Sequence, residues 1–140
     1  MAAQRLESPE TQTHLRFIVA VIDRCVESER VVPELLGAGL LPPNIQLFYA
    51  HQNPAHADSI GLPLGRLQVT LQYLEALLVL DAPISREYQE YWEAGRHILL
   101  ANVYRDSDAK TVAAVLGKSQ SHSGRILSYG HTAKLLALAV

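Results

Sequence analysis

The side chains best suited to chemistry lie near the C-terminus, in a polar segment between positions 118 and 125. The segment contains Lys118, Ser119, Gln120, Ser121, His122 and Arg125. All of these side chains can donate hydrogen bonds, and those of lysine and arginine carry a fixed positive charge. Such a set is typical of a surface that faces a polyanion.

Charge is distributed unevenly along the chain. The formal net charge of −2 argues against a broadly cationic coat of the kind that covers many nucleic-acid-binding proteins. Residues 1–104 carry seven basic and 12 acidic side chains, a balance of −5, whereas residues 105–140 carry five basic and two acidic ones, a balance of +3. This division favours an acidic body with a basic C-terminal part.

Residues 112–127 resemble a bacterial helix-turn-helix. In that motif a first helix with a small packing residue ends in glycine, and a serine caps a second helix that lies in the DNA major groove. The resemblance implies that Ala113 is the small contact, Gly117 the turn and Ser119 the N-cap, with Leu116, Ile126 and Leu127 as apolar anchors. It also implies that Lys118, Ser119, Gln120, Ser121, His122 and Arg125 contact DNA bases or phosphates. The alternative is a helical hairpin with no role in nucleic-acid binding.

Proline, glycine and capping residues predict about six helices. The main ones span residues 9–28, 64–80, 85–104, the two helices of the helix-turn-helix and 133–140. Strand signals are weak, because no stretch alternates between apolar and polar residues between hairpin turns. We therefore predict an all-α fold, a compact bundle of about six helices in a single domain over 1–140. In this domain, residues 1–104 form an acidic helical body and residues 105–140 a basic, helix-turn-helix-like part.

An aromatic stripe lies on the inner side of the predicted helix 85–104. It includes Tyr88, Tyr91 and Trp92. Aromatic side chains at helical spacing favour packing against the apolar central helix 64–80. The alternative is a ligand-binding pocket between these two helices, with the three aromatic residues as ligand contacts.

Other residues with chemical potential give weaker signals. His51, His56 and Asp58 are of types that bind zinc, but their spacing fits no specific signature, so we expect a solvated loop and no metal. The sequence has no Gly-x-Ser-x-Gly elbow and no HExxH pair, and Cys25, on an apolar stripe, is a poor nucleophile. We therefore expect a protein that is not an enzyme and holds no cofactor.

The chain as given shows no sign of export or membrane insertion. Its N-terminal residues lack the apolar stretch of a secretory signal, and no window reaches the about 18 to 20 apolar residues that span a bilayer. The single cysteine cannot form an internal disulfide, which fits a reducing compartment. We expect a cytoplasmic protein with no membrane partner.

Two functional hypotheses follow from the sequence. The first is a small DNA-binding regulator or accessory protein that binds double-stranded DNA through its C-terminal part. Its strongly apolar last helix, 133–140, would then form a homodimer, although the same helix could pack on the body instead. The second is a helical protein-interaction or small-molecule-binding module that does not bind DNA.

Overall fold

A five-stranded sheet forms the centre of the structure, a computed structural model that describes residues 15–23, 25–49, 66–119 and 121–135. The strand order is β2-β3-β1-β4-β5, and every pair of neighbours is antiparallel. The strands are β1 (Arg16–Ile22), β2 (Ile45–Phe48), β3 (His97–Val103), β4 (Ser121–Ser128) and β5 (His131–Lys134).

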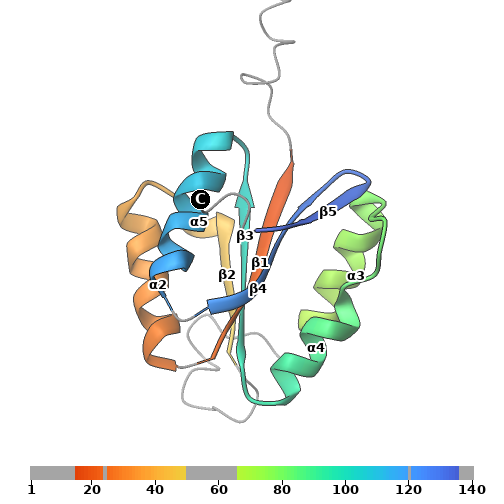
Figure 1. The fold of residues 1–140 in the computed structure, drawn as a ribbon, viewed down its shortest axis with the longest axis horizontal. Helices are drawn as coiled ribbons and strands as arrows, with labels where there is room; N and C mark the ends of the chain where they lie inside the picture. Colours follow the sequence, from red (N-terminus) through yellow and green to blue (C-terminus); the bar gives the residue numbers. More distant parts are fainter. Residues whose placement is uncertain (1–14, 24, 50–65, 120, 136–140) are drawn as a thin grey trace, which may run out of the picture.

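Helices cover both faces of this sheet (Figure 1). Two of them, α2 (Cys25–Gly37) and α5 (Asp106–Lys118), lie on one face, and α3 (Arg66–Leu78) and α4 (Ser85–Glu93) lie on the other. A short 3-10 turn, η1 (Pro42–Asn44), precedes β2. None of the helices in the described part of the chain is long and apolar enough to cross a membrane.

The connectivity is that of two interleaved βαβ units. The first unit is β1-α2-β2 and the second is β3-α5-β4, and each unit places one of its strands between the two strands of the other. This is the split βαβ, or ferredoxin-like, arrangement. Helices α3 and α4 are inserted between the two units, and β5 extends the sheet beyond β4.

The prediction of an all-α bundle is wrong, because the central strands are buried on both faces. In β1, Ile18, Ala20 and Ile22 belong to the core under α2 and α5, whereas the alternate residues belong to the core under α3 and α4. A strand covered on both faces has a continuous apolar run instead of a polar alternation. Such a run also fits helical spacing, so periodicity alone does not separate the two structures.

Two predicted helices therefore contain strands. The predicted helix 9–28 contains β1, and its residues 9–14 lie outside the described part of the chain. The predicted helix 85–104 ends as α4 at Glu93, after which Gly95 adopts a φ of 99° and the chain continues as β3. A positive φ is favourable for glycine and stops a helix.

Other predicted helices are present or fall partly outside the description. The central helix exists as α3, and the helix expected after Tyr104 exists as α5. The predicted last helix begins within β5, which includes Ala133 and Lys134, and residues 136–140 are outside the described part.

A carboxylate from α3 caps the start of α4. Glu75 Oε2 accepts hydrogen bonds from the backbone nitrogens of Ile84 at 2.6 Å and Ser85 at 2.7 Å. The N-cap position of α4 is Ile84, whose own side chain makes no capping hydrogen bond. The charge of Glu75 also lies at the positive end of the α4 dipole. This interaction joins the two inserted helices.

Replacing Glu75 tests this cap. We expect Glu75→Ala to lower the free energy of unfolding by about 1–3 kcal/mol, because two backbone donors lose a charged acceptor. Urea denaturation followed by circular dichroism measures the change. Glu90→Ala is the matched control, since Glu90 is an exposed glutamate of α4, and we expect it to stay within about 0.5 kcal/mol of wild type. Equal effects of the two variants would contradict the capping role.

Candidate functional site

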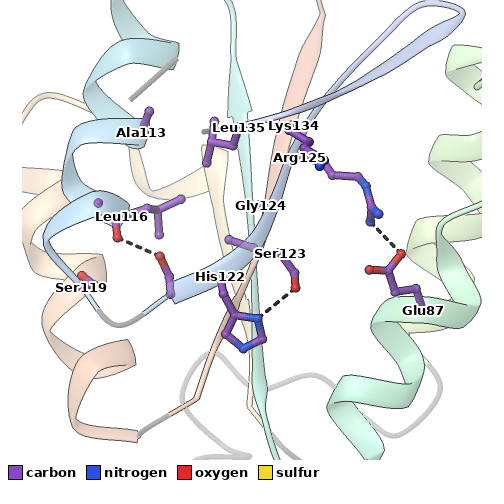
Figure 2. Close-up of a pocket in the computed structure, with 13 residues that line it drawn as sticks. Glu87, Ala113, Leu116, Ser119, His122, Ser123, Gly124, Arg125, Lys134 and Leu135 are labelled. Carbon is purple, nitrogen blue, oxygen red and sulfur yellow. Dashed lines mark hydrogen bonds and ion pairs between the residues drawn. The ribbon is translucent and has the colours of Figure 1, made fainter. Parts of the chain in front are cut away.

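A cavity of about 590 Å³ lies beside β4 and is bounded by α5 and by the end of β5 (Figure 2). Its apolar lining comes from Ala20, Ala113, Leu116 and Leu135. A volume of this size, with an apolar floor and a few polar groups, is typical of small-molecule sites.

The polar lining of this cavity contains hydroxyl groups, an imidazole and charged side chains. The hydroxyls are those of Ser119, Ser121 and Ser123, and the other polar groups are His122, Arg125, Lys134 and Glu87. Arg125 points across β4 toward α4, where its Nη1 lies 2.8 Å from Oε1 of Glu87 (Figure 2). Lys134 makes no ion pair with any residue that the structure describes.

A bulge in β4 decides which way these side chains point. Arg125 pairs with Val19 of β1 and His122 pairs with Val21, so two residues of β4, Ser123 and Gly124, face one residue of β1. In a regular strand, residues three apart point to opposite faces. The bulge instead places His122 and Arg125 on the same face as Val19 and Val21, the face covered by α4.

Ser123 occupies the bulge in a strained conformation. Its φ is 55°, in the left-handed region that a residue with a Cβ seldom adopts. Glycine is the usual residue at such a bulge position, and a side chain there costs about 1–2 kcal/mol. The surroundings hold the serine in place, since its carbonyl accepts a hydrogen bond from the Tyr88 hydroxyl and its Oγ lies 3.0 Å from the Tyr91 hydroxyl oxygen.

His122 connects Ser123 to an acidic residue that directly follows β1. Its Nδ1 lies 2.9 Å from Ser123 Oγ, and its Nε2 lies 2.8 Å from Oδ1 of this residue, Asp23. Arg96 Nη1 donates to the same oxygen of Asp23 at 3.0 Å. The imidazole also meets the Tyr91 ring edge to face, with 5.4 Å between the centroids. These contacts fix the orientation of the imidazole.

The neighbouring Tyr88 and Arg125 keep fixed protonation states. Burial raises the pKa of the Tyr88 hydroxyl well above its ordinary value, although the adjacent Arg125 charge acts in the opposite direction. Partial burial lowers the pKa of Arg125, but the hydrogen bond to Glu87 and the nearby Tyr88 oxygen outweigh it and raise that pKa. Tyr88 therefore remains a neutral donor to Ser123, and Arg125 remains a cation.

Gly124 allows the end of β5 to close over the bulge. A Cβ on this residue would lie 2.9 Å from Cδ2 and 3.0 Å from Cβ of Leu135, which is closer than real Cβ contacts. The Leu135 amide also donates to the Gly124 carbonyl at 3.0 Å. A side chain at position 124 would displace Leu135 from the cavity wall.

The helix-turn-helix interpretation is wrong about the local structure. Its first helix exists within α5, but the residues of its second helix form β4, which is hydrogen-bonded to β1 and β5. Ser123 and Gly124 have a low helix propensity. Hydrogen bonding of β4 to strands on both of its edges favours the extended conformation further. The helix expected in the major groove is absent from this segment, so DNA binding stays a prediction without its structural basis.

The six residues predicted to contact DNA have different places in the structure. Lys118 is the last residue of α5, Ser119 is its C-cap, and Gln120 lies outside the described residues. Ser121, His122 and Arg125 belong to β4, and together with Ser119 they line the cavity.

The aromatic stripe packs in the core, as its spacing favoured. Tyr88 is 0% and Trp92 2% exposed, and both belong to the core between α3, α4 and the sheet. Trp92 Nε1 donates to the carbonyl of Tyr49, whereas the Tyr88 and Tyr91 hydroxyls reach Ser123. Ligand contact by these three residues stays a prediction. The proposed metal-type residues His51, His56 and Asp58 lie outside the described part.

Four residues of the site were missed by the sequence analysis. They are Asp23, Glu87, Ser123 and Lys134. Asp23 is 99 positions from His122, so only the pairing of β1 with β4 brings them together. The run Ser121–Gly124 contained the remaining signal, since serine, histidine and glycine together are unusual inside a strand.

Comparisons with known proteins do not identify the chain. No protein-family model matches it, and neither the curated proteins nor the solved structures contain a match.

Two substitutions of Ser123 measure the strain of the bulge. Ser123→Ala and Ser123→Gly both remove the hydroxyl, but only glycine accepts the observed φ at no cost. We expect the glycine variant to be more stable than the alanine variant by about 1–2 kcal/mol in urea denaturation. Equal stability, or a more stable alanine variant, would contradict a strained backbone at this position.

The buried hydroxyl of Tyr88 predicts a loss of stability in alkali. A raised pKa stabilises the folded chain below the ordinary tyrosine pKa of 10.0, and this contribution falls as the pH rises beyond that value. Above this pH we expect wild type to lose up to about 1.4 kcal/mol per pH unit more than Tyr88→Phe. Denaturant unfolding of both proteins across this range measures the difference, and parallel curves would argue against a buried neutral hydroxyl.

Proposed function

We propose that the protein binds a small molecule with an apolar body and an anionic group in the cavity beside β4. The observation that carries this proposal is that Lys134 and Arg125 line the same cavity as the apolar residues Leu116 and Leu135. The proposal follows the second hypothesis from the sequence, a small-molecule-binding module, but moves the site from the α3–α4 contact to the cavity beside β4.

The apolar part of the ligand would lie against α5 and the end of β5. Ala113 and Leu116 are buried residues of α5, and Leu135 closes the same wall. Burial of a short alkyl chain there contributes about 0.8 kcal/mol for each methylene group. The floor therefore favours a chain of several carbons over a purely polar solute.

The charged groups favour an anion at the polar end. Arg125 is already paired with Glu87, which neutralises part of its charge, whereas Lys134 is exposed and free of ion pairs among the described residues. The hydroxyls of Ser119 and Ser121 donate to the carbonyls of Val115 and Leu116. These two hydroxyls therefore have no proton left to donate to an anion. The positive charge of Lys134 is the group that favours an anionic ligand.

Titration with three six-carbon probes tests this proposal. We expect hexanoate to shift the backbone amide resonances of residues 121–124 and of Lys134, and to bind more tightly than hexanol or hexylamine. Lys134→Ala should weaken hexanoate binding about threefold to tenfold, the size of one partly exposed charge pair. Lys110→Ala, an exposed lysine at the start of α5, is the matched control and should leave the affinity unchanged. Equal binding of all three probes, or shifts confined to the α3–α4 face, would overturn the proposal.

A further inference from the structure

Asp23, His122 and Ser123 form a continuous chain of hydrogen bonds in the wall of the cavity. The two links measure 2.8 Å from Asp23 Oδ1 to His122 Nε2 and 2.9 Å from His122 Nδ1 to Ser123 Oγ. An ionised carboxylate only accepts, so Nε2 carries the proton and donates to Asp23. Nδ1 of the neutral imidazole is then an acceptor, and the Ser123 hydroxyl donates to it.

We propose that Ser123 is a nucleophile for acyl transfer, with His122 as its general base and Asp23 as the residue that orients the imidazole. A serine whose hydroxyl donates to a carboxylate-oriented histidine is the arrangement that activates serine in hydrolases of unrelated folds. The substrate class is an ester of a short-chain carboxylic acid. This inference rests on the proposed function, because the same cavity would hold the acyl chain.

The strained backbone at Ser123 supports a catalytic role over a purely structural one. Glycine would adopt this bulge conformation at no cost, so serine lowers the stability of the backbone here. A requirement for its hydroxyl would account for a serine at this position. Residues held in such conformations by their surroundings cluster at active sites. Three hydrogen bonds hold this serine, two at Oγ and one at the carbonyl oxygen.

The relay is accessible from the cavity. The side chains of His122 and Asp23 are 36% and 38% exposed, and both His122 and Ser123 line the cavity. Ser123 itself is half-buried at the border of this cavity. The exposure of Asp23 also means that solvent screens its charge, so its contribution to the rate is smaller than that of a buried aspartate.

The proposed reaction has two balanced steps. In the first, Ser123 Oγ forms a bond to the ester carbonyl carbon, its proton moves to His122 Nδ1, and the same proton passes to the alcohol that leaves as the old C–O bond breaks. In the second, water attacks the acyl carbon and gives a proton to His122, which returns it to Oγ as the acyl bond breaks. The carboxylic acid is released and no oxidant or reductant is needed.

Tyr91 is positioned to assist the negative charge that develops in each step. Since the Ser123 hydroxyl donates to His122, the bond between the two hydroxyls runs from Tyr91 to Ser123 Oγ. Once Oγ becomes an ester oxygen, the Tyr91 proton is available to the oxyanion on the attacked carbon. Tyr91→Phe should therefore lower kcat for ester hydrolysis and leave hexanoate binding unchanged.

The test uses covalent trapping of the full chain with diisopropyl fluorophosphate. Attack by Ser123 Oγ forms an O–P bond and releases fluoride together with the serine proton. We expect one adduct, located at Ser123 by peptide mass spectrometry, and steady hydrolysis of p-nitrophenyl hexanoate. Labelling should be abolished in Ser123→Ala and in the more stable Ser123→Gly, about 100-fold slower in His122→Ala and about 10-fold slower in Asp23→Asn.

Two matched controls separate the relay from general reactivity. Ser128→Ala removes another half-buried serine of β4, and His131→Ala removes a histidine that lies 3.9 Å from Asp81. Both should react at the wild-type rate, and the melting temperature of every variant confirms that it is folded.

Other outcomes would overturn the inference without touching the binding proposal. Hexanoate binding with no adduct would leave the cavity as a binding site and eliminate the nucleophile. An adduct that forms equally fast in His122→Ala would eliminate the relay. An adduct at Ser123 without hexanoate binding would instead support the relay and overturn the proposed ligand class.

Discussion

Burial of the sheet on both faces is the constraint on which the rest of the structure depends. The residues of β1 are almost all enclosed, and β3 has a single residue that is only partly buried. Most positions of these two strands are therefore apolar, and their polar residues, Arg16, His97 and Asn102, lie at or next to the strand ends. The polar groups gather instead on β4, which is half-buried along most of its length and lies between β1 and the short β5. The position of the cavity follows from this division between apolar and polar strands.

The same constraint explains what the sequence could predict. An almost continuously apolar stretch located α3, and the capping residues after Tyr104 located α5. The strands β1 and β3 are buried on both faces, so their sequences do not alternate between apolar and polar residues, and they were assigned to helices. At the site, the sequence analysis singled out Ser121, His122 and Arg125 as DNA contacts, which stays a prediction, and the helical conformation assigned to them was wrong. The relay through Asp23 was out of reach, because it depends on a pairing between strands distant in the chain.

Contacts from the inserted helices α3 and α4 hold the bulged part of β4 in the cavity wall. Glu75 of α3 holds the first turn of α4, and α4 places Tyr88 and Tyr91 against the serine of the bulge. The ion pair between Glu87 and Arg125 adds a second attachment of α4 to β4. The two helices that are additional to the split βαβ core therefore carry the side chains that position Ser123. Fold and site are connected through α4, although α5 forms one wall of the cavity.

The bulge at Ser123 and Gly124 changes which residues of β4 point to each face of the sheet. Successive residues of a strand point to alternate faces of the sheet. The extra residue interrupts this alternation between the two halves of β4. Deletion of Ser123 would restore regular pairing, with Gly124 alone opposite Ala20, and would leave His122 opposite Val21 and Arg125 opposite Val19. Such a deletion would thus remove the serine that Tyr88, Tyr91 and His122 hold, while the side chains on both sides of the bulge kept their faces.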